Sequence, residues 1–511
     1  MLSKVISAGF SGIDGYAVTV ETDVNSGMPS FDIVGLPDTA VKESKERVRS
    51  AVKNCGFAFP SRKVIVNLAP ADIRKEGSIY DLPVAISYLI ATGQLSEDAA
   101  KENAFLGELS LNGELRPVKG VLSMVLSLKQ EGIKNVFLPF ENSVEAAVVD
   151  GINIYGAENL LQITGHLEGN NALDPEEVDV DALFKLKAPH MIDFSDVRGQ
   201  QKVKRALEIA AAGNHNVLML GPPGAGKTMI AKRIPTILPD MTLEEALEVT
   251  KIHSIAGMVD NKSPLVTTRP FRNPHHTISA NGLTGGGSVP RPGEVSLAHN
   301  GVLFLDELPE FNKNVLEVLR QPLEDRVVTI SRVSATNTYP CNIMFVSSMN
   351  PCPCGYYGDP SGKCTCSSYQ ISNYLNKISG PLLDRIDIHI EVASVEYEEL
   401  KNKAFGESSY DIRQRVNNAR KIQQARYKEH SILSNSELSS SLMDKYCALD
   451  DESNELLKNA FNKFGLSARA HNRILKVART IADLEESTNI SSSHIAEAIR
   501  YRTLDKKFWN K

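Results

Sequence analysis

Alternating and helical patterns of apolar residues divide the N-terminal third of the chain into strands and helices. The runs GYAVTVETDV (15–24) and SRKVIVNLAP (61–70) alternate apolar with polar residues, which is typical of half-buried strands. Between them, DTAVKESKERVRSAVKNCG (38–56) has the spacing of an amphipathic helix. These patterns predict an α+β domain over residues 1–165.

The pattern changes twice further along the chain. Residues 166–192 are rich in acidic side chains and favour a solvated linker. From 193 to 395, short apolar runs alternate with helices, as strands buried on both faces of a parallel sheet do. These runs are NVLMLG, GVLFLDE, CNIMFVSSMN and IDIHIEV. Residues 396–511 have helical periodicity almost throughout, so we expect an α/β domain followed by an all-α domain.

Composition limits the classes of function. The formal net charge of −6 excludes a generally basic nucleic-acid binder, so that any contact with DNA has to be local. No apolar run is long enough for a membrane span, and glycines and Asp14 interrupt the N-terminus where a signal peptide needs an apolar core. We therefore expect a cytoplasmic protein. Three of the seven cysteines, Cys55, Cys341 and Cys447, lie far apart, as in a reduced compartment.

A phosphate-binding loop follows the strand NVLML. GPPGAGKT fits the pattern G-x-x-x-x-G-K-[ST] and precedes the helix MIAKRI, which is the context that this loop requires. Its backbone N–H groups face phosphate oxygens, its lysine neutralises the β- and γ-phosphates, and its threonine reaches Mg²⁺. The predicted nucleotide-binding residues are Gly221, Pro222, Pro223, Gly224, Ala225, Gly226, Lys227 and Thr228.

Two acidic residues and an amide end the next apolar strands. Asp306 and Glu307 follow GVLFL, and ligands of open α/β sheets bind at this end of the strands. Asp306 would hold Mg²⁺ together with Thr228, and Glu307 would polarise the attacking water. Alone, two such acids are often only a strand leaving the core. Asn350 ends CNIMFVSSMN and suits the orientation of that water.

Arg385 begins a later strand in SGPLLDRIDIHI and has two interpretations. It forms a buried salt bridge with Asp384 or Asp387, or it is an arginine finger that completes the site of a neighbouring subunit.

The stretch between Lys227 and Asp306 is longer than the helix and strand of a compact P-loop domain, so we expect an insertion at about 250–300. Its glycines (Gly285, Gly286, Gly287) and arginines (Arg269, Arg272, Arg291) suit a mobile loop that touches a polymer in a pore. The alternative is a surface loop without contacts. His275 and His276 lack cysteine or acidic partners at ligand spacing, which disfavours a metal site there.

Four cysteines, Cys352, Cys354, Cys364 and Cys366, lie in the turn-rich loop 350–366. Four thiolates suffice for tetrahedral Zn²⁺ and leave no position open for a reactive water, so the pattern favours a structural brace. Unliganded thiols and a redox switch are the alternatives.

The predicted helix SYDIRQRVNNARKIQQARYKEH carries six basic residues. It is either a solvated face or a contact for the phosphate backbone of DNA, with Tyr427 available to stack on a base.

Four segments resemble the magnesium-chelatase-like AAA+ ATPases. They are FSDVRGQQKVKRALEIAAAGNHNVLMLGPPGAGKT, GVLFLDELPEF, GPLLDRID and LSARAHNRILKVARTIADL. RPFRNPHHTISANGLTGGGSVPRPGEVSLAHNG resembles the ComM/YifB family, and the likeness covers nearly the whole chain. The resemblance implies a hexameric ring in which Glu307 is the base, Asn350 the sensor, Arg385 a finger in trans and Arg469 a sensor arginine in a helical lid, with Arg473 as a substitute.

The N-terminal segments KEGSIYDLPVAIS and GELRPVKGVLSM resemble the peptidase domain of Lon. The lysine of that family's Ser-Lys pair is present as Lys119. Ile79 stands where the serine belongs, and Ser78 lies one position early. Since a nucleophile must lie within reach of its base, we expect a Lon-like fold without peptidase activity.

ATP and Mg²⁺ are the expected ligands. The family resemblance adds DNA, single-stranded or branched, as partner of a helicase in recombination or natural transformation. A chaperone-like ATPase subunit of a metal-insertion complex and a protein-remodelling ATPase are the alternatives.

Overall fold

The computed structural model describes residues 2–185, 192–259, 263–287, 290–332, 336–359, 362–394, 406–430 and 432–509. The chain forms two compact units. Unit 1 comprises residues 1–186 and 243–267, and unit 2 comprises 187–242 and 268–511. The ends of the predicted linker and of the predicted ATPase domain, at 186–191 and 395–405, lie outside the described residues.

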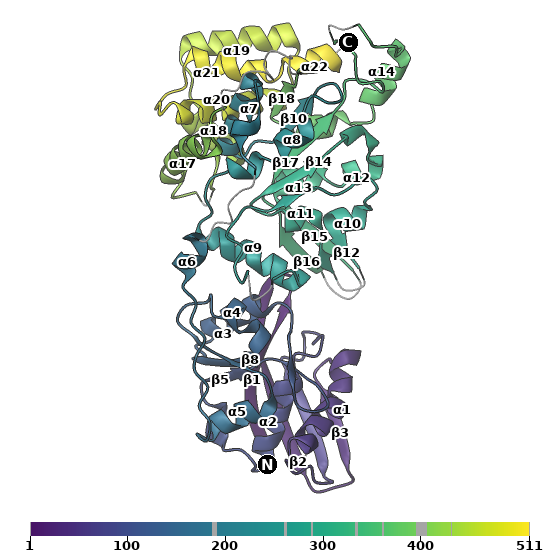
Figure 1. Ribbon diagram of the computed structural model, residues 1–511, viewed down its shortest axis with the longest axis vertical. Helices are drawn as coiled ribbons and strands as arrows, with labels where there is room; N and C mark the ends of the chain where they lie inside the picture. The colour runs from purple at the N-terminus through teal and green to yellow at the C-terminus, as the bar shows by residue number, and fades with distance from the viewer. Residues whose placement is uncertain are drawn as a thin grey trace. The chain divides into compact units, whose positions relative to one another are not determined.

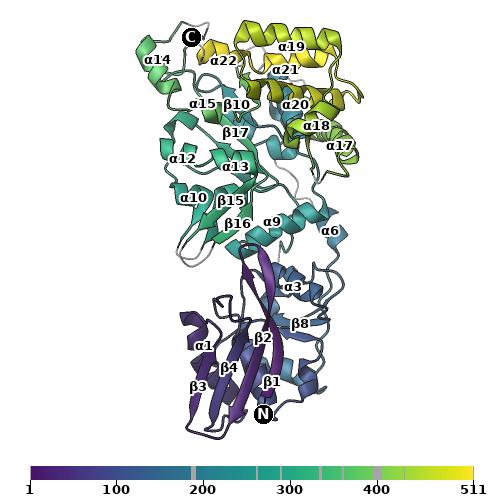
Figure 2. The same ribbon diagram turned by 180° about the vertical axis from the view of Figure 1, so that it is seen from behind.

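A seven-stranded sheet of order β3-β4-β2-β1-β5-β8-β9 organises unit 1 (Figure 1). β1 and β2 form a long antiparallel pair that Figure 2 shows side by side, and β5, β8 and β9 continue in parallel. The strands of this unit are β1 (Leu2–Ser11), β2 (Asp14–Asn25), β3 (Ser30–Val34), β4 (Lys63–Ala69), β5 (Asn103–Phe105), β6 (Glu108–Leu109), β7 (Leu115–Arg116), β8 (Asn135–Pro139) and β9 (Asn153–Ala157).

The helices of unit 1 bury apolar faces against this sheet. In α1 the buried positions include Val41, Val48 and Val52, at helical spacing, and every residue of α2 is buried. These helices are α1 (Thr39–Asn54), α2 (Asp81–Ala91), η1 (Glu97–Ala100), α3 (Val121–Gln130), α4 (Phe140–Ala146), α5 (Leu160–Leu167), α6 (Val180–Lys185) and α9 (Leu243–Ala256). α6 lies within the stretch predicted as a linker.

Helix α9 belongs to unit 1, although the sequence places it after the phosphate-binding loop. It packs on α3, and its buried face includes Val249, Ile252 and Ile255. The hydroxyl of Ser254 donates a hydrogen bond to the buried carboxylate of Glu145, which is in α4. The first part of the predicted insertion therefore completes the N-terminal unit.

A five-stranded parallel sheet of order β11-β14-β17-β10-β18 forms the centre of unit 2. All residues of β10, β14 and β17 are buried, which confirms the parallel sheet expected from the apolar runs. The strands of this unit are β10 (Val217–Leu220), β11 (Phe271–Arg272), β12 (Gly285–Gly286), β13 (Arg291–Pro292), β14 (Val302–Leu305), β15 (Val327–Ser331), β16 (Thr336–Pro340), β17 (Met344–Met349) and β18 (Ile388–Glu391).

Helices flank the sheet and form the C-terminal helical region, which is confirmed. We call the helices from α17 to α22 the lid. One continuous apolar core joins the sheet to the lid, and it includes Val217 and Phe304 of the sheet and Ile474 and Ile495 of the lid. The helices are η2 (Phe194–Asp196), α7 (Gln201–Gly213), α8 (Lys227–Ala231), η3 (Ile234–Thr236), α10 (Ala280–Thr284), α11 (Glu294–Leu297), η4 (Leu308–Glu310), α12 (Lys313–Glu317), α13 (Arg320–Asp325), α14 (Ser368–Leu375), α15 (Gly380–Leu383), α17 (Ser409–Arg426), η5 (Asn435–Glu437), α18 (Ser440–Tyr446), α19 (Asp451–Phe464), α20 (Ala468–Leu484), α21 (Ser492–Arg500) and α22 (Thr503–Phe508).

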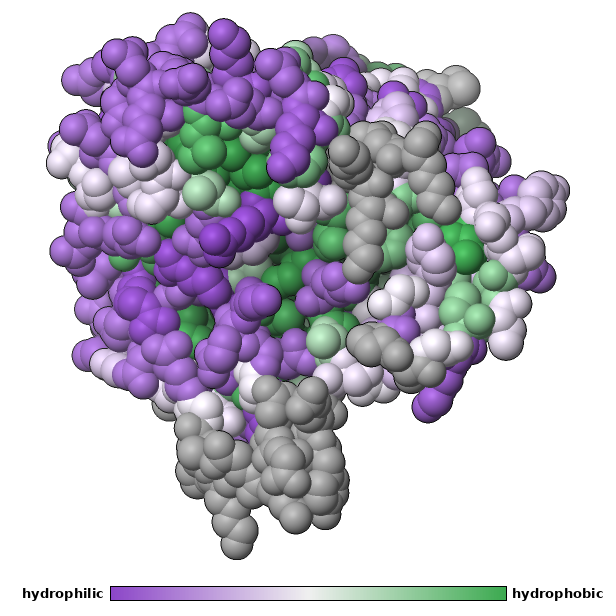
Figure 3. Space-filling view, turned by 90° about the horizontal axis from the view of Figure 1, so that it is seen from above, coloured by the Kyte–Doolittle hydropathy of each residue, from purple (hydrophilic) through white to green (hydrophobic). Residues whose placement is uncertain are grey.

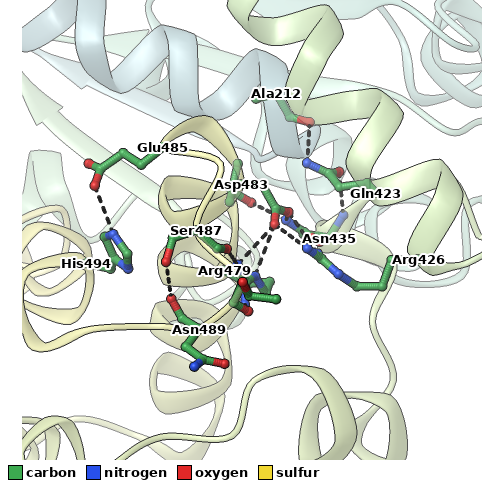
Figure 4. Close-up of polar contacts among 12 residues, drawn as sticks. Ala212, Gln423, Arg426, Asn435, Arg479, Asp483, Glu485, Ser487, Asn489 and His494 are labelled. Atoms are coloured by element: carbon green, nitrogen blue, oxygen red, sulfur yellow. Dashed lines mark hydrogen bonds and ion pairs between the residues drawn. The ribbon is translucent and has the colours of Figure 1, made fainter.

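A buried polar network holds the lid helices together (Figure 4). Asp483 in α20 is 1% exposed and pairs with Arg426 of α17 and with Arg479. Asn435 donates a hydrogen bond of 2.8 Å to the same carboxylate, and Gln423 donates one of 3.2 Å to the carbonyl of Ala212 in α7. Each buried charge in this network therefore has a partner of opposite sign.

Hydrophilic residues cover most of the face shown in Figure 3, around a furrow in which apolar residues are visible. Within the described ranges, no helix is both long enough and apolar enough to cross a membrane.

Candidate functional site: a nucleotide pocket and a four-cysteine cluster

The phosphate-binding loop joins the buried strand β10 to helix α8, as predicted. Gly224 and Gly226 have φ angles of +78° and +86°, which favour glycine because a Cβ is strained there. A Cβ at Gly221 would lie 2.2 Å from the carbonyl oxygen of Val392, so that this position also excludes a side chain. The glycines therefore shape the loop for the close approach of phosphate.

Lys227 lies at the centre of the loop. Its Nζ donates to the carbonyls of Gly221 at 2.7 Å and Pro222 at 3.0 Å, and to Asn350 Oδ1 at 3.1 Å. Burial lowers the pKa of Lys227, while the negative charges of Asp306 and Glu307 act in the opposite direction. The ammonium is thus partly desolvated and faces the two carboxylates.

Asp306 and Thr228 meet directly. The hydroxyl of Thr228 donates to Asp306 Oδ2 at 2.6 Å, and the hydroxyl of Ser348 donates to Asp306 Oδ1. A hydroxyl beside a carboxylate is the oxygen pair that Mg²⁺ uses in P-loop proteins. Ser348 was missed from the sequence, although it lies on β17 only two residues before Asn350, which follows the end of that strand.

Glu307 is exposed and has a left-handed backbone with φ of +54°. Its N–H donates to Asp306 Oδ1 at 3.1 Å, which holds the turn. A non-glycine residue in this conformation costs about 1–3 kcal/mol and is common at functional sites.

These side chains line one cavity of about 340 Å³, together with residues of the loop. The structure therefore brings together the predicted positions from three elements, namely Lys227 and Thr228, Asp306 and Glu307, and Asn350. The donor set of main-chain N–H groups, an ammonium, a hydroxyl and two carboxylates fits a magnesium nucleotide.

The predicted arginines lie elsewhere. Arg385 is buried, pairs with Glu324, and donates to the carbonyls of Arg320 at 2.9 Å and Pro381 at 2.7 Å. The salt-bridge alternative was right in kind but wrong in partner, because Asp384 and Asp387 do not pair with Arg385.

Those two acids pair with arginines of the lid. Arg469 lies 3.7 Å from Asp384 with its side chain 61% exposed, and Arg473 lies 2.8 Å from the buried Asp387. These arginines and Arg385 line a second cavity of about 380 Å³ that shares no lining residue with the phosphate-loop cavity.

The insertion uses some of its arginines internally. Arg272 forms a two-pronged pair with Glu294, and Arg269 donates to the carbonyls of Pro239 at 2.6 Å and Asn300 at 2.8 Å. Both side chains are thus held by internal contacts, and their part in a mobile pore loop stays a prediction. Arg291 is exposed in β13 and remains a candidate. Residues 260–262 and 288–289 lie outside the described residues.

The expectation that Tyr427 stacks on a base is wrong. Tyr427 is 1% exposed and its hydroxyl donates to Asn435 at 2.6 Å. Arg426 pairs with Asp483, and Arg415 pairs with Glu208 and Glu407, so that these two arginines of α17 serve packing.

In the N-terminal unit, Ile79 is buried and the hydroxyl of Ser78 donates to Glu108. Lys119 is exposed and lies beside Gly257. The absence of peptidase activity stays a prediction.

The four cysteines of loop 350–366 come together. Their sulfur atoms all lie within 4.8 Å of one another, and among the described residues they are the one group of this kind with metal-ligand geometry. None forms a disulfide. The N–H groups of Tyr356 and Thr365 donate to Cys354 and lower the pKa of its thiol to about 6. The ring centroids of His275 and His276 lie 4.0 Å apart with the rings tilted by 37°, and neither residue is part of such a group. Residues 360–361 lie outside the described residues.

Three sequence families match the chain. The family described as magnesium chelatase, subunit ChlI, covers residues 193–400, the one described as subunit ChlI of Mg-chelatase covers 20–142, and the ChlI C-terminal family covers 406–502.

The competence protein ComM of Haemophilus influenzae is 43% identical over 507 residues, which are 98% of each chain. YifB of Escherichia coli is 42% identical over 507 residues, 99% of this chain and 98% of that one. Lon protease 2 of Bacillus subtilis is 32% identical over 149 residues, 26% of each chain. The chain therefore belongs to the ComM/YifB family of magnesium-chelatase-like AAA+ proteins.

Proposed function

We propose that the protein is an ATP-hydrolysing ring motor, a hexamer, that acts on DNA as a helicase or branch-migration factor. The observation that carries the ATPase part is the meeting of Lys227, Thr228, Asp306, Glu307 and Asn350 around one cavity. Family membership supports the same activity.

Each residue has a role that its place allows. The N–H groups of the loop and Lys227 bind the phosphates, and Thr228 and Asp306 hold Mg²⁺, which neutralises charge on the β- and γ-phosphates. The carboxylate of Glu307 accepts a proton from water, and the amide of Asn350 orients that water. Asn350 already contacts Lys227, so that nucleotide binding and water orientation involve neighbouring groups.

The position of two arginines supports the proposal of a ring. Arg385 and Arg469 line a cavity separate from the phosphate-binding loop of their own chain, so we propose that they complete the site of a neighbouring subunit. Arg385 would have to leave Glu324 for that role.

DNA is proposed as the partner because a relative of nearly equal length has the name competence protein, and competence is the uptake of DNA. The contact that we propose is the β12–β13 hairpin. Arg291 of this hairpin is exposed. Arg332, which follows β15, is also exposed, and its Nε donates to the carbonyl of Gly287 at 3.3 Å.

A second candidate function is protein remodelling, which the similarity to Lon protease 2 favours. A chaperone-like role in a metal-insertion complex is a further alternative, which the match to chelatase families favours.

We further propose that the four-cysteine cluster binds Zn²⁺ as a structural metal.

ATP turnover with and without forked DNA separates these functions. A DNA motor shows turnover stimulated by DNA, and the stimulation weakens as salt rises. Arg291→Ala with Arg332→Ala reduces stimulation, whereas Lys421→Ala, at an exposed lysine of the lid, does not. Stimulation by unfolded polypeptide and none by DNA would replace the DNA motor with a protein remodeller.

A further inference from the structure

The cysteine cluster has distances that suit a thiolate-bound metal. The Sγ of Cys352 lies 3.3 Å from that of Cys354 and 3.8 Å from that of Cys364, and Cys354 and Cys364 are 3.7 Å apart. Four sulfurs around a tetrahedral Zn²⁺ at 2.3 Å are separated by about 3.8 Å. The cluster thus needs little movement to close around this ion.

The loop that carries the cluster begins at the nucleotide cavity. Asn350, whose amide contacts Lys227, precedes Cys352 by two residues, and Cys352 is buried. The backbone N–H of Asn350 donates to the hydroxyl of Tyr374, which lies on α14 beyond the last cysteine. Both ends of the loop therefore connect to the residue that faces the phosphates.

The middle of the loop touches the phosphate-binding loop. Gly355 has φ of +87°, and a Cβ at this position would lie 2.4 Å from Cδ of Pro223. Pro223 lines the nucleotide cavity. The backbone of the cysteine loop is thus packed against the wall of the cavity without room for a side chain.

We propose that Zn²⁺ held by Cys352, Cys354, Cys364 and Cys366 positions Pro223 and Asn350, so that occupancy of the metal site controls nucleotide affinity. A turn-rich loop of this length loses about 1–2 kcal/mol per residue in entropy when ordered, and a structural metal offsets much of this cost. Without the metal the loop releases both contacts. The inference rests on the proposed function only in taking ATP as the ligand of the cavity.

The metal content of the protein tests whether the four cysteines bind zinc. The purified full-length protein is expected to contain one zinc per chain, and Co²⁺ in its place should give the absorption bands of a tetrahedral thiolate site. Cys364→Ser with Cys366→Ser should lose the metal, while Cys55→Ser, outside the cluster, should keep it. Absence of zinc in the unaltered protein, or iron in its place, would overturn the proposal.

Two glycine variants test whether the cysteine loop positions the wall of the nucleotide cavity. Gly355→Ala should keep zinc but weaken binding of a fluorescent ADP analogue by about tenfold or more, because the new methyl group displaces Pro223. Gly362→Ala is the matched control, since Gly362 also has a positive φ, +65°, in the same loop but has nothing within 4 Å of its Cβ position. Equal affinities in these two variants would contradict the coupling.

The cluster variant completes the test. Cys364→Ser with Cys366→Ser should weaken nucleotide binding as Gly355→Ala does, with the far-ultraviolet circular dichroism of the folded protein retained. Unchanged affinity in the metal-free protein would refute the proposal. None of these measurements contains DNA, so that a failure of DNA to stimulate turnover would count against the proposed motor and not against this coupling.

Discussion

Glu307 is exposed, lines the nucleotide cavity and has a backbone conformation that most residues avoid. Glu307→Gln keeps the size of the side chain but removes the proton acceptor. We expect ATP turnover to fall by about 10²- to 10⁴-fold with nucleotide binding retained. Steady-state turnover and analogue binding measure the two effects. Glu310→Gln, an exposed neighbour, is the control, and turnover within twofold of the unaltered protein for Glu307→Gln would rule out the proposed base.

Arg385 is tested by mixing subunits. Arg385→Ala and Lys227→Ala should each reduce turnover by about 10³-fold if the arginine acts in trans. In mixed rings, a subunit with intact Lys227 can receive Arg385 from its neighbour, so an equimolar mixture should recover a substantial part of the turnover. A mixture as inactive as its components would show that both residues serve the same subunit.

At the residue scale, sequence predicts what depends on neighbours along the chain. The phosphate-binding loop was predictable because its strand, glycines and helix are contiguous. The partner of Arg385 was not, since Glu324 lies 61 positions away and meets it only after folding. Tyr427 was misjudged for a different reason. Its hydroxyl partner Asn435 is near in sequence, but nothing in that sequence shows that the tyrosine ring is buried in the lid core.

The lid helices depend on one buried carboxylate, Asp483, which two arginines share. Asp483→Asn leaves Arg426 and Arg479 without their buried counter-charge, and we expect the free energy of unfolding of unit 2 to fall by about 3 kcal/mol or more. Denaturant titration measures this. Asp444→Asn, exposed on α18, is the control and should change stability by less than about 0.5 kcal/mol. Equal effects would mean that water reaches the network.

Lys476 on α20 makes the free energy of unfolding of this helical region depend on pH. Burial, followed by the charge of Arg473, lowers the pKa of Lys476 to about 8. Below pH 8 the folded and unfolded states both carry the proton. Between pH 8 and about 10.4, the unfolded state binds more protons, so the free energy of unfolding rises with pH. Relative to Lys476→Met, the unaltered protein should therefore gain stability across this window in denaturant titrations. A constant difference between the two proteins would exclude the shift.

At the element scale, the helical and strand patterns predicted the parallel sheet and the helical region, because burial on one or both faces leaves a period in the sequence. The same patterns could not show what α9 packs against. Its apolar stripe predicts a buried face, but only the fold reveals that α3 covers it.

For the whole molecule, the assignment of α9 to unit 1 predicts that residues 1–186 do not make a complete domain. Produced alone, this fragment leaves the side of α3 that α9 covers exposed to water. Addition of residues 243–267 through a flexible linker should raise its Tm by about 5 °C or more. The same linker followed by 243–267 with Val249→Asp and Ile252→Asp is the control. Equal Tm values for the fragments with and without the segment would contradict the assignment.

The division into units also means that the chain passes from one unit to the other three times, near 186, 242 and 267. The N-terminal unit therefore consists of two separate segments of the chain, and cleavage of a single peptide bond cannot release it. A protease that nicks the acidic stretch 166–185 should produce two fragments that co-elute in native buffer and part only in denaturant. Exchange of this unit between relatives must likewise carry residues 243–267 with it, because the graft is otherwise missing one of its own helices.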